Sequence, residues 1–276
     1  MDFLGRRFRI GNLINRRVIM VMTGLGMLNA GIATEILLSL FNVNGVIHFG
    51  IAGNANPNLQ IGDVVIPKYW AHTGLLNWQR YGDTPDNLLS LEGNGDYTRK
   101  LGYLQFSDYS SDHRKNDNSS KNLLNRVWYQ PEETFLTNGV AEERSHAFWV
   151  PVNNHFYEVA KIMEGATLSN CWEKHCLSKA PIVAMVDRGS SSNIFVDNAA
   201  YRKFLSAKFN VTPIDMESAA VALVCHQQRI PFIAFRALSD LAGGGPFQSN
   251  EADIFAPLAA ENAVKVVFRF IALLSR

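Results

Sequence analysis

The chain has 276 residues with 26 basic and 25 acidic side chains, for a formal net charge of +1. This balance leaves no excess of positive charge that would attract nucleic acid or an anionic membrane surface. No apolar run is long enough to cross a bilayer. With 47% hydrophobic and 18% charged residues, the composition is that of a globular protein with a sizeable core. We therefore expect neither nucleic acid nor a membrane as a partner.

Strands and helices alternate in the first part of the chain. Residues 8–11 and 18–22 predict two paired strands joined by an Asn-rich turn, and a Gly-rich turn follows at 23–26. The pattern then predicts a helix over 28–40, a strand over 45–49, a Gly-rich turn over 50–54 and a strand over 63–66. Such a succession favours a mostly parallel sheet covered by helices.

The composition changes over residues 75–145, which are rich in Asn, Asp, Ser and Tyr. We expect an insertion of loops and short strands there, with a mobile loop over the polar block 112–121. No linker divides the chain, so we expect a single domain over 1–276 with an inserted, loop-rich region at about 75–145.

The alternation of strands and helices resumes after the insertion. The pattern predicts a helix over 156–163, a strand over 182–186, a helix over 198–209 capped by Asp197, a strand over 230–236 and a long helix after Glu251. Between the last two helices, residues 215–218 indicate a strand end that turns into a further helix.

Three cysteines leave at least one unpaired within the chain. Cys225 lies in an apolar helical stretch and is expected to be a buried free thiol. Cys171 and Cys176 are close in sequence and form a disulfide only if the compartment is oxidising. The segment that holds them offers too few ligands for a metal site.

Carboxylates and an arginine follow two neighbouring strands near residues 215 and 236, where α/β folds place their ligands. Glu217 could accept hydrogen bonds from hydroxyl groups while Asp240 transfers a proton, with Arg236 nearby. The alternative is structural: the two carboxylates satisfy free N–H groups at helix N-termini, and Arg236 pairs with a buried carboxylate. His48 and His72 stand near strand ends, and no chemistry is assigned to them.

An ordered set of motifs makes a resemblance specific over nearly the whole chain. The chain resembles the purine nucleoside phosphorylase and methylthioadenosine nucleosidase superfamily, and within it the plant bark and vegetative storage protein branch. The superfamily motifs are Thr23-Gly24-Leu25-Gly26, Gly50-Ile51-Ala52-Gly53, Ile61-Gly62-Asp63-Val64-Val65, Asp215-Met216-Glu217-Ser218-Ala219 and Arg236-Ala237-Leu238-Ser239-Asp240. The branch motifs are Ala55-Asn56-Pro57, Trp70-Ala71-His72 and Asn77-Trp78-Gln79-Arg80-Tyr81.

The resemblance implies an α/β fold, a three-layer αβα sandwich around a twisted mixed sheet, and assembly into a homo-oligomer. It implies a purine nucleoside as the small-molecule partner and cleavage of its N-glycosidic bond by phosphate or by water. No metal or organic cofactor is implied, although phosphate can be a co-substrate.

Site residues carry over by motif. The resemblance implies that Asp240 protonates or hydrogen-bonds the purine N7, with Ser239 in support and Arg236 as a third catalytic residue. It implies that Glu217 accepts hydrogen bonds from the ribose hydroxyls and that Met216 packs under the sugar. The remaining implied substrate-binding residues are Phe195, which stacks on the base after a one-residue shift of the alignment, and Gly24 and Gly53 of the glycine turns.

Two departures from the family pattern favour an alternative, a storage-type protein that keeps the fold with weak or no catalysis. Ile51 stands where many members have Ser or Thr, and an apolar side chain cannot donate a hydrogen bond to phosphate or water. We also expect the family's first strand to be missing, because Met1 matches a point downstream of it. Residues 1–17 are basic and lack the apolar stretch of a secretory signal, so the sequence assigns no compartment.

Overall fold

The computed structural model describes residues 1–78, 98–105, 126–244 and 251–274. The mobile loop expected over 112–121 lies outside these residues.

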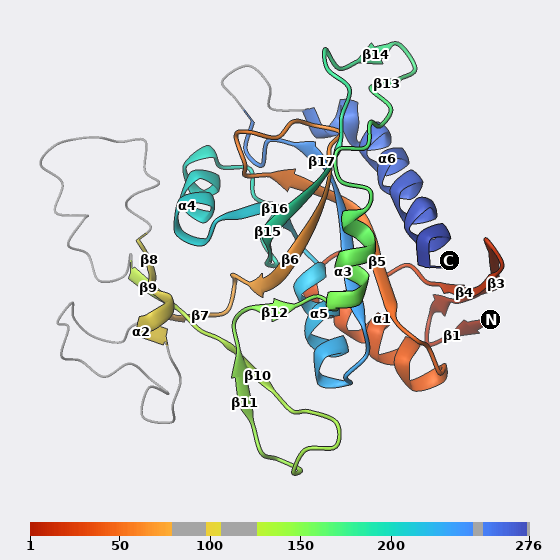
Figure 1. The fold of residues 1–276 in the computed structure, drawn as a ribbon. Helices are drawn as coiled ribbons and strands as arrows, with labels where there is room; N and C mark the ends of the chain where they lie inside the picture. The colour runs from red at the N-terminus through yellow and green to blue at the C-terminus, as the bar shows by residue number, and fades with distance from the viewer. Residues whose placement is uncertain (79–97, 106–125, 245–250, 275–276) are drawn as a thin grey trace, which may run out of the picture.

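A six-stranded mixed sheet forms the centre of the molecule (Figure 1). Its strands, in spatial order, are β12 (Val150–Pro151), β6 (Val64–His72), β15 (Val183–Ser191), β16 (Val211–Asp215), β5 (Val46–Asn54) and β17 (Phe232–Asp240). Neighbours are parallel in the pairs β6–β15, β15–β16 and β5–β17, and antiparallel in β16–β5 and β12–β6. β17 also pairs antiparallel with β6, at Arg236–Val65 and Ala237–Val64, so that five strands close into a ring.

Helices cover both faces of this sheet. α1 (Met27–Leu40) and α5 (Ser218–Gln227) pack together on one face, whereas α3 (Asn154–Lys161) and α6 (Glu251–Leu274) cover the other. α4 (Ala199–Phe209) packs beside β16. This arrangement confirms the expected three-layer α/β fold with a mixed sheet.

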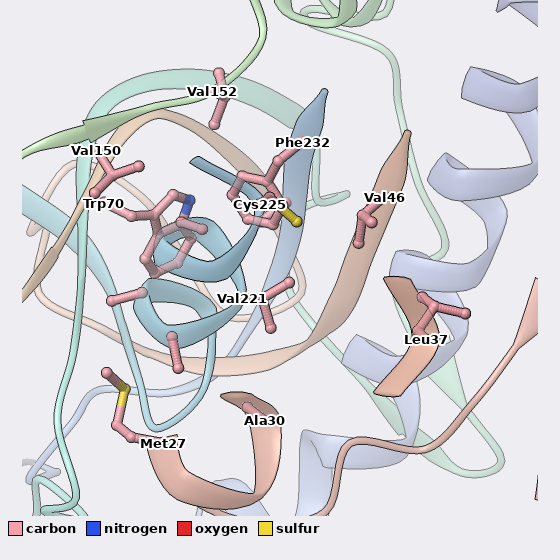
Figure 2. Packing of buried hydrophobic residues seen from close by; sticks show 14 of the residues in the cluster. Met27, Ala30, Leu37, Val46, Trp70, Val150, Val152, Val221, Cys225 and Phe232 are labelled. Atoms are coloured by element: carbon pink, nitrogen blue, oxygen red, sulfur yellow. The ribbon is translucent and has the colours of Figure 1, made fainter. Parts of the chain in front are cut away.

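The hydrophobic core is divided between the faces of the sheet. On the face of α1 and α5, Trp70 of β6 packs with Val221 and Cys225 of α5 and with Phe232 of β17 (Figure 2). On the other face, α6 buries one apolar side against β17, including the contact of Phe270 with Phe235. The site described below lies where the strands emerge from this double core.

Short strands lie outside the central sheet. The hairpin β3–β4 confirms the expected pairing near the N-terminus, because Arg9 lies opposite Met20. The peripheral strands are β1 (Asp2–Phe3), β2 (Arg6–Arg7), β3 (Arg9–Leu13), β4 (Arg16–Met20), β7 (Leu76–Trp78), β8 (Tyr103–Gln105), β9 (Arg126–Tyr129), β10 (Glu132–Thr134), β11 (Ser145–Ala147), β13 (Cys171–Trp172) and β14 (His175–Cys176), and the short helix α2 is Thr98–Leu101. Strands β7 to β10 and α2 fall within the stretch where the sequence predicts an insertion, and β11 begins at its end.

Two local expectations are wrong. The turn expected over 50–54 is the second half of β5, because its backbone keeps pairing with β17 and its glycines admit close neighbours rather than a bend. The cap of α4 is Asn198 and not Asp197: the Asn198 side chain accepts a hydrogen bond from the Tyr201 amide. An amide side chain at this position satisfies one of the free N–H groups of the first turn.

The motif around Asp63 links β6 to two other segments. The Asp63 carboxylate accepts hydrogen bonds from the amides of Gln60 and Ile182 at 2.9 and 2.8 Å, and burial raises the pKa of this carboxyl group. The Gly62 amide donates to the Leu238 carbonyl oxygen of β17, and the Leu238 amide donates to the Asp63 carbonyl oxygen. Asp63 therefore has a structural role that places β17.

The cysteines behave differently from one another. Cys225 is a buried free thiol, as expected, and burial raises its pKa. Cys171 and Cys176 face each other across the hairpin β13–β14 and form a disulfide. In the part of the chain that the structure describes, no helix is both long and apolar enough to span a bilayer.

Removing the disulfide is expected to cost little stability, since it closes a loop with a sequence separation of only five. Chain-entropy arguments give up to about 2 kcal/mol for so short a loop. We expect a Cys171→Ser, Cys176→Ser double variant to lose no more than this in urea unfolding under non-reducing conditions. A single alkylatable thiol in the unreduced wild-type chain after unfolding, assigned to Cys225 by mass spectrometry, would support the pairing, whereas three would contradict it.

Candidate active site

Polar side chains gather where β16, β5 and β17 lie side by side. Ile214 of β16 is opposite Gly53 of β5, and Gly53 is opposite Asp240 of β17. Asp215 ends β16, and Glu217 immediately precedes α5. The topology thus brings both sequence-predicted carboxylates, Glu217 and Asp240, to strands on either side of β5.

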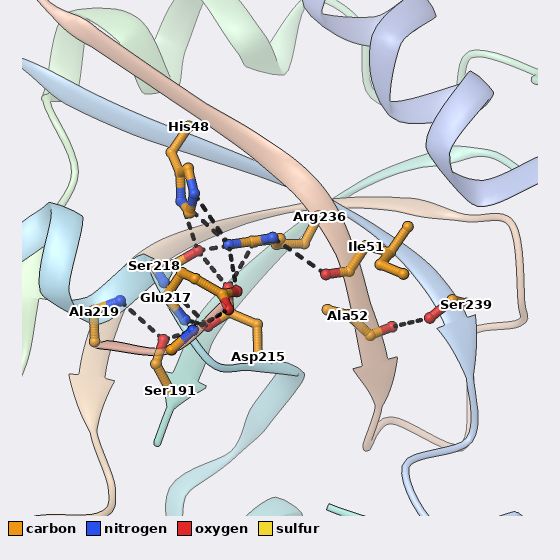
Figure 3. Close-up of polar contacts among 11 residues, drawn as sticks. His48, Ile51, Ala52, Ser191, Asp215, Glu217, Ser218, Ala219, Arg236 and Ser239 are labelled. Carbon is orange, nitrogen blue, oxygen red and sulfur yellow. Dashed lines mark hydrogen bonds and ion pairs between the residues drawn. The ribbon is translucent and has the colours of Figure 1, made fainter. Parts of the chain in front are cut away.

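A buried ion pair lies beneath this edge. Arg236 Nε is 2.6 Å from Asp215 Oδ2, and the two side chains are 4% and 1% exposed (Figure 3). The same Nε lies 2.9 Å from Ser218 Oγ, and Nη1 donates to the Ile51 carbonyl oxygen at 3.2 Å. Every nitrogen of the guanidinium group therefore faces a polar partner, which is what a buried charge requires.

Asp215 also organises the start of α5. Its carboxylate accepts hydrogen bonds from the hydroxyls of Ser191 and Ser218 and, at 3.2 Å, from the amides of Glu217 and Ser218. Ser191 Oγ in turn accepts from the Ala219 amide at 2.8 Å. A carboxylate at a helix N-terminus satisfies free N–H groups. Satisfying free N–H groups at a helix N-terminus was the structural alternative for Glu217 and Asp240. At the start of α5, Asp215 has this role.

Glu217 is more accessible than Asp215, with its side chain 14% exposed. Its Oε1 accepts a hydrogen bond from the Gly26 amide at 2.9 Å, and its Oε2 lies 3.6 Å from Arg236 Nη2. Burial raises the pKa of Glu217, and the charge of Asp215 adds to this, while the Gly26 amide and Arg236 act against it. The carboxylate is therefore held by the Gly26 amide and faces the guanidinium group of Arg236.

The turn before α1 supplies that hydrogen bond. Gly24 and Gly26 both have positive φ, at 84° and 90°, a conformation that L side chains rarely adopt. The next amide, of Met27, donates to Asn193 Oδ1 at 2.9 Å. Gly24 thus shapes the turn that delivers the Gly26 amide to Glu217.

Asp240 ends β17 and is fixed from two sides. Ser239 Oγ lies 2.8 Å from Asp240 Oδ1 and 3.3 Å from the Ala52 carbonyl oxygen, and the Ala242 amide donates to Asp240 Oδ2 at 2.9 Å. Ser239 therefore helps to hold the Asp240 carboxylate in place, and the role of Asp240 as an acid stays a prediction. The Asp240 side chain is only partly buried.

The glycines of β5 allow close packing around the site. A Cβ on Gly50 would lie 2.4 Å from Arg236 Nη1, and one on Gly53 would lie 2.8 Å from the Ala242 Cβ. Ile51 contributes its carbonyl oxygen to Arg236, whereas its side chain points away from the polar cluster and is 39% exposed (Figure 3). At position 51, the backbone carbonyl group and not the side chain takes part in the described cluster.

Two predicted contacts lie apart from this polar network. Met216 stands between Asp215 and Glu217 in the chain and is half-buried, and its packing against a sugar stays a prediction. Phe195 lies on the loop after β15 and is 69% exposed. Its proposed stacking on a base remains a prediction.

Sequence reasoning missed several members of the cluster. His48 of β5 is buried, with Nδ1 3.1 Å from Ser218 Oγ. Burial, together with the charge of Arg236, lowers the pKa of His48 well below its ordinary value. Ser191 lay outside every motif, and Asp215 and Ser218 stood within one without an assigned role. A signal for His48 was its place in a buried strand two residues before a glycine.

The part of the chain with described coordinates contains no group of three His, Cys, Asp or Glu side chains placed to hold a metal ion. His72, at the end of β6, pairs through Nδ1 with Glu132 of β10. This pair joins the strand end to the stretch predicted as an insertion.

We expect Asp215→Ala to destabilise the fold strongly, because it leaves the Arg236 charge buried without its partner. Breaking a buried pair in this way costs about 3–5 kcal/mol. Urea unfolding measures the loss. The exposed Asp2–Arg7 pair is the control, and Asp2→Ala should change stability little. Equal small effects of the two substitutions would contradict the central role of the buried pair.

Glu217→Gln is expected to raise the melting temperature at pH 7. Because burial raises the pKa of Glu217, its contribution to stability is present at low pH and is lost as the pH rises through that raised pKa. The amide removes this cost, so the gain should vanish below about pH 4, where glutamate is protonated in both states. The exposed Glu158→Gln is the control. A variant less stable than wild type at pH 7 would refute this expectation.

Comparisons with known proteins find relatives that align over nearly the whole chain. A model of the phosphorylase superfamily matches residues 2–114 and 175–272. The chain is 30% identical over 273 residues to bark storage protein A of Populus deltoides, in an alignment that covers 98% of this chain and 78% of that protein. It is 27% identical over 271 residues to a 5′-methylthioadenosine/S-adenosylhomocysteine nucleosidase of Lysinibacillus sphaericus, covering 98% and 87%.

A solved structure shares the fold. The 5′-methylthioadenosine/S-adenosylhomocysteine nucleosidase from Neisseria meningitidis, in complex with methylthio-immucillin-A, superimposes with a TM-score of 0.64 at 22% identity, covering 99% of this chain and 88% of that one. The family match includes both segments that build the polar cluster, residues 23–65 and 215–240. This chain therefore belongs to the phosphorylase superfamily, as its motifs indicated.

Proposed function

We propose that this protein cleaves the N-glycosidic bond of purine nucleosides. The observation that carries the proposal is the placement of two carboxylates with different surroundings on either side of β5. Glu217 is held by an amide and faces Arg236, while Asp240 is held by Ser239 and the Ala242 amide. A nucleoside needs such a pair, one group for the sugar hydroxyls and one for the departing base.

Asp240 is the proposed acid. When the C1′–N9 bond breaks, its electron pair goes to the base, and a proton delivered to N7 lets the base leave. Ser239 Oγ lies 2.8 Å from Asp240 Oδ1 and 3.3 Å from the Ala52 carbonyl oxygen, and the Ala242 amide holds Asp240 Oδ2, so the proposed acid is held in a fixed orientation.

Glu217 is the proposed ribose ligand. Its Oε2 is the oxygen without a close hydrogen bond, and a carboxylate oxygen accepts from a hydroxyl readily. Met216 would pack against the sugar beside it. Arg236 acts here by holding Glu217 and Asp215, since its own side chain is almost fully buried.

The nucleophile that bonds to C1′ is water or phosphate. Ile51 offers no side-chain hydrogen-bond donor to either, and an anionic phosphate depends more on such donors than a neutral water does. We therefore propose hydrolysis ahead of phosphorolysis. The chain's own carboxylates supply the chemistry in both cases.

A second candidate function is protein storage with little or no catalysis. It is favoured by the 30% identity to bark storage protein A. This function requires the fold but no working catalytic site.

The deciding experiment measures adenine release from adenosine and 5′-methylthioadenosine, with and without phosphate. We expect phosphate-independent release by the wild-type chain. Asp240→Asn should lower kcat by about 10²–10⁴, the usual contribution of a general acid.

Asp187→Asn is the matched control, since Asp187 is an exposed carboxylate of β15 that should not affect turnover. Adenine release that persists at the wild-type rate in Asp240→Asn would show that Asp240 is not the general acid. No release by a folded wild-type chain would reject the enzyme in favour of the storage protein.

A further inference from the structure

His48 is the one imidazole inside the described polar cluster. Its described contacts are with Arg236 and Ser218, and not with Glu217 or Asp240. Its ring lies against Arg236: Nη2 of the arginine is 3.2 Å from Nδ1 and 3.3 Å from Nε2 (Figure 3). Because these two distances are almost equal, the guanidinium nitrogen lies across the ring and is not aligned with a single lone pair. Such contact between a cation and an aromatic face is attractive.

Arg236 is thereby restrained on every side. Nε faces Asp215 and Ser218, Nη1 faces the Ile51 carbonyl oxygen, and Nη2 lies between the His48 ring and Glu217. A second restraint holds the ring itself, since His48 Nδ1 is 3.1 Å from Ser218 Oγ. Without the ring, Nη2 would be free to close its 3.6 Å distance to Glu217 Oε2.

The consequence concerns the oxygen that a ribose needs. A guanidinium group prefers a close, two-point pair with a carboxylate, and such a pair would occupy Oε2. The neutral imidazole offers Nη2 another neighbour without adding charge. Glu217 then keeps an oxygen that can accept from a hydroxyl.

We propose that His48 is a positioning residue for Glu217: it holds the Arg236 guanidinium so that Asp215 takes the close ion pair and Glu217 stays available to the ribose hydroxyls. The inference rests on the proposed function. It extends that function to a sugar preference, because a site that depends on Glu217 in this way selects ribonucleosides over 2′-deoxyribonucleosides.

The test compares kcat/KM for adenosine with kcat/KM for 2′-deoxyadenosine, and the binding of both by calorimetry. We expect wild type to favour adenosine at least about tenfold, the effect of losing one hydrogen bond to a charged group. His48→Leu fills the space without a planar ring and should lower this ratio about tenfold. His48→Phe keeps the ring face and should retain most of it.

His155→Phe, at an exposed position of α3, is the control and should keep the wild-type ratio. A merely structural role for His48 would reduce turnover of both nucleosides equally and leave their ratio unchanged, which would overturn the inference. If His48→Leu fails to fold, His48→Asn is measured instead, with the same two outcomes.

The two proposals fail in different ways. If wild type neither cleaves nor binds either nucleoside, the proposed function is wrong and the role of His48 falls with it. If wild type discriminates between the sugars and both His48 variants do so equally well, only the role of His48 is wrong.

Discussion

The buried ion pair of Asp215 and Arg236 is the constraint on which the rest of the site depends. It joins β16 to β17 across β5, and neither side chain could remain charged at this depth without the other. Asp215 then fixes the start of α5 through Ser218 and its amides, and Arg236 fixes the distance to Glu217. The exposed half of the site therefore takes its geometry from the buried half.

This constraint explains the backbone of β5. Arg236 can cross to Asp215 only because Gly50 has no Cβ, which would lie 2.4 Å from Nη1. The strand can then stay paired with β17 through Ala52 while the arginine passes over it. The same segment contributes the Ile51 carbonyl oxygen, so a glycine that looks like a turn signal is needed for the approach of a side chain.

How far the sequence predicts the site follows from how local each part is. Glu217 and Asp240 stand in short motifs at strand ends, and both could be named. His48 could not be given a role, because its partner Ser218 is 170 positions away and only the sheet brings them together. The length of β5 was underestimated for a related reason: glycine propensity favours a turn, while pairing with β17, a long-range contact, decides the outcome. The helices α1, α3 and α5 were predictable because apolar residues at helical spacing are a local signal.

The cost of the cluster bears on the choice between enzyme and storage protein. Buried ion pairs are weak sources of stability, and well-packed apolar residues of similar volume often serve as well or better. Glu217 adds to the cost, since burial raises the pKa of its carboxyl group and ionisation at neutral pH opposes folding. A fold that only had to be stable would gain by replacing Glu217, and a fold that binds a sugar would not. A buried carboxylate that opposes folding at neutral pH, beside a restrained arginine, is what a ligand-binding site requires, and it favours the nucleoside over the scaffold.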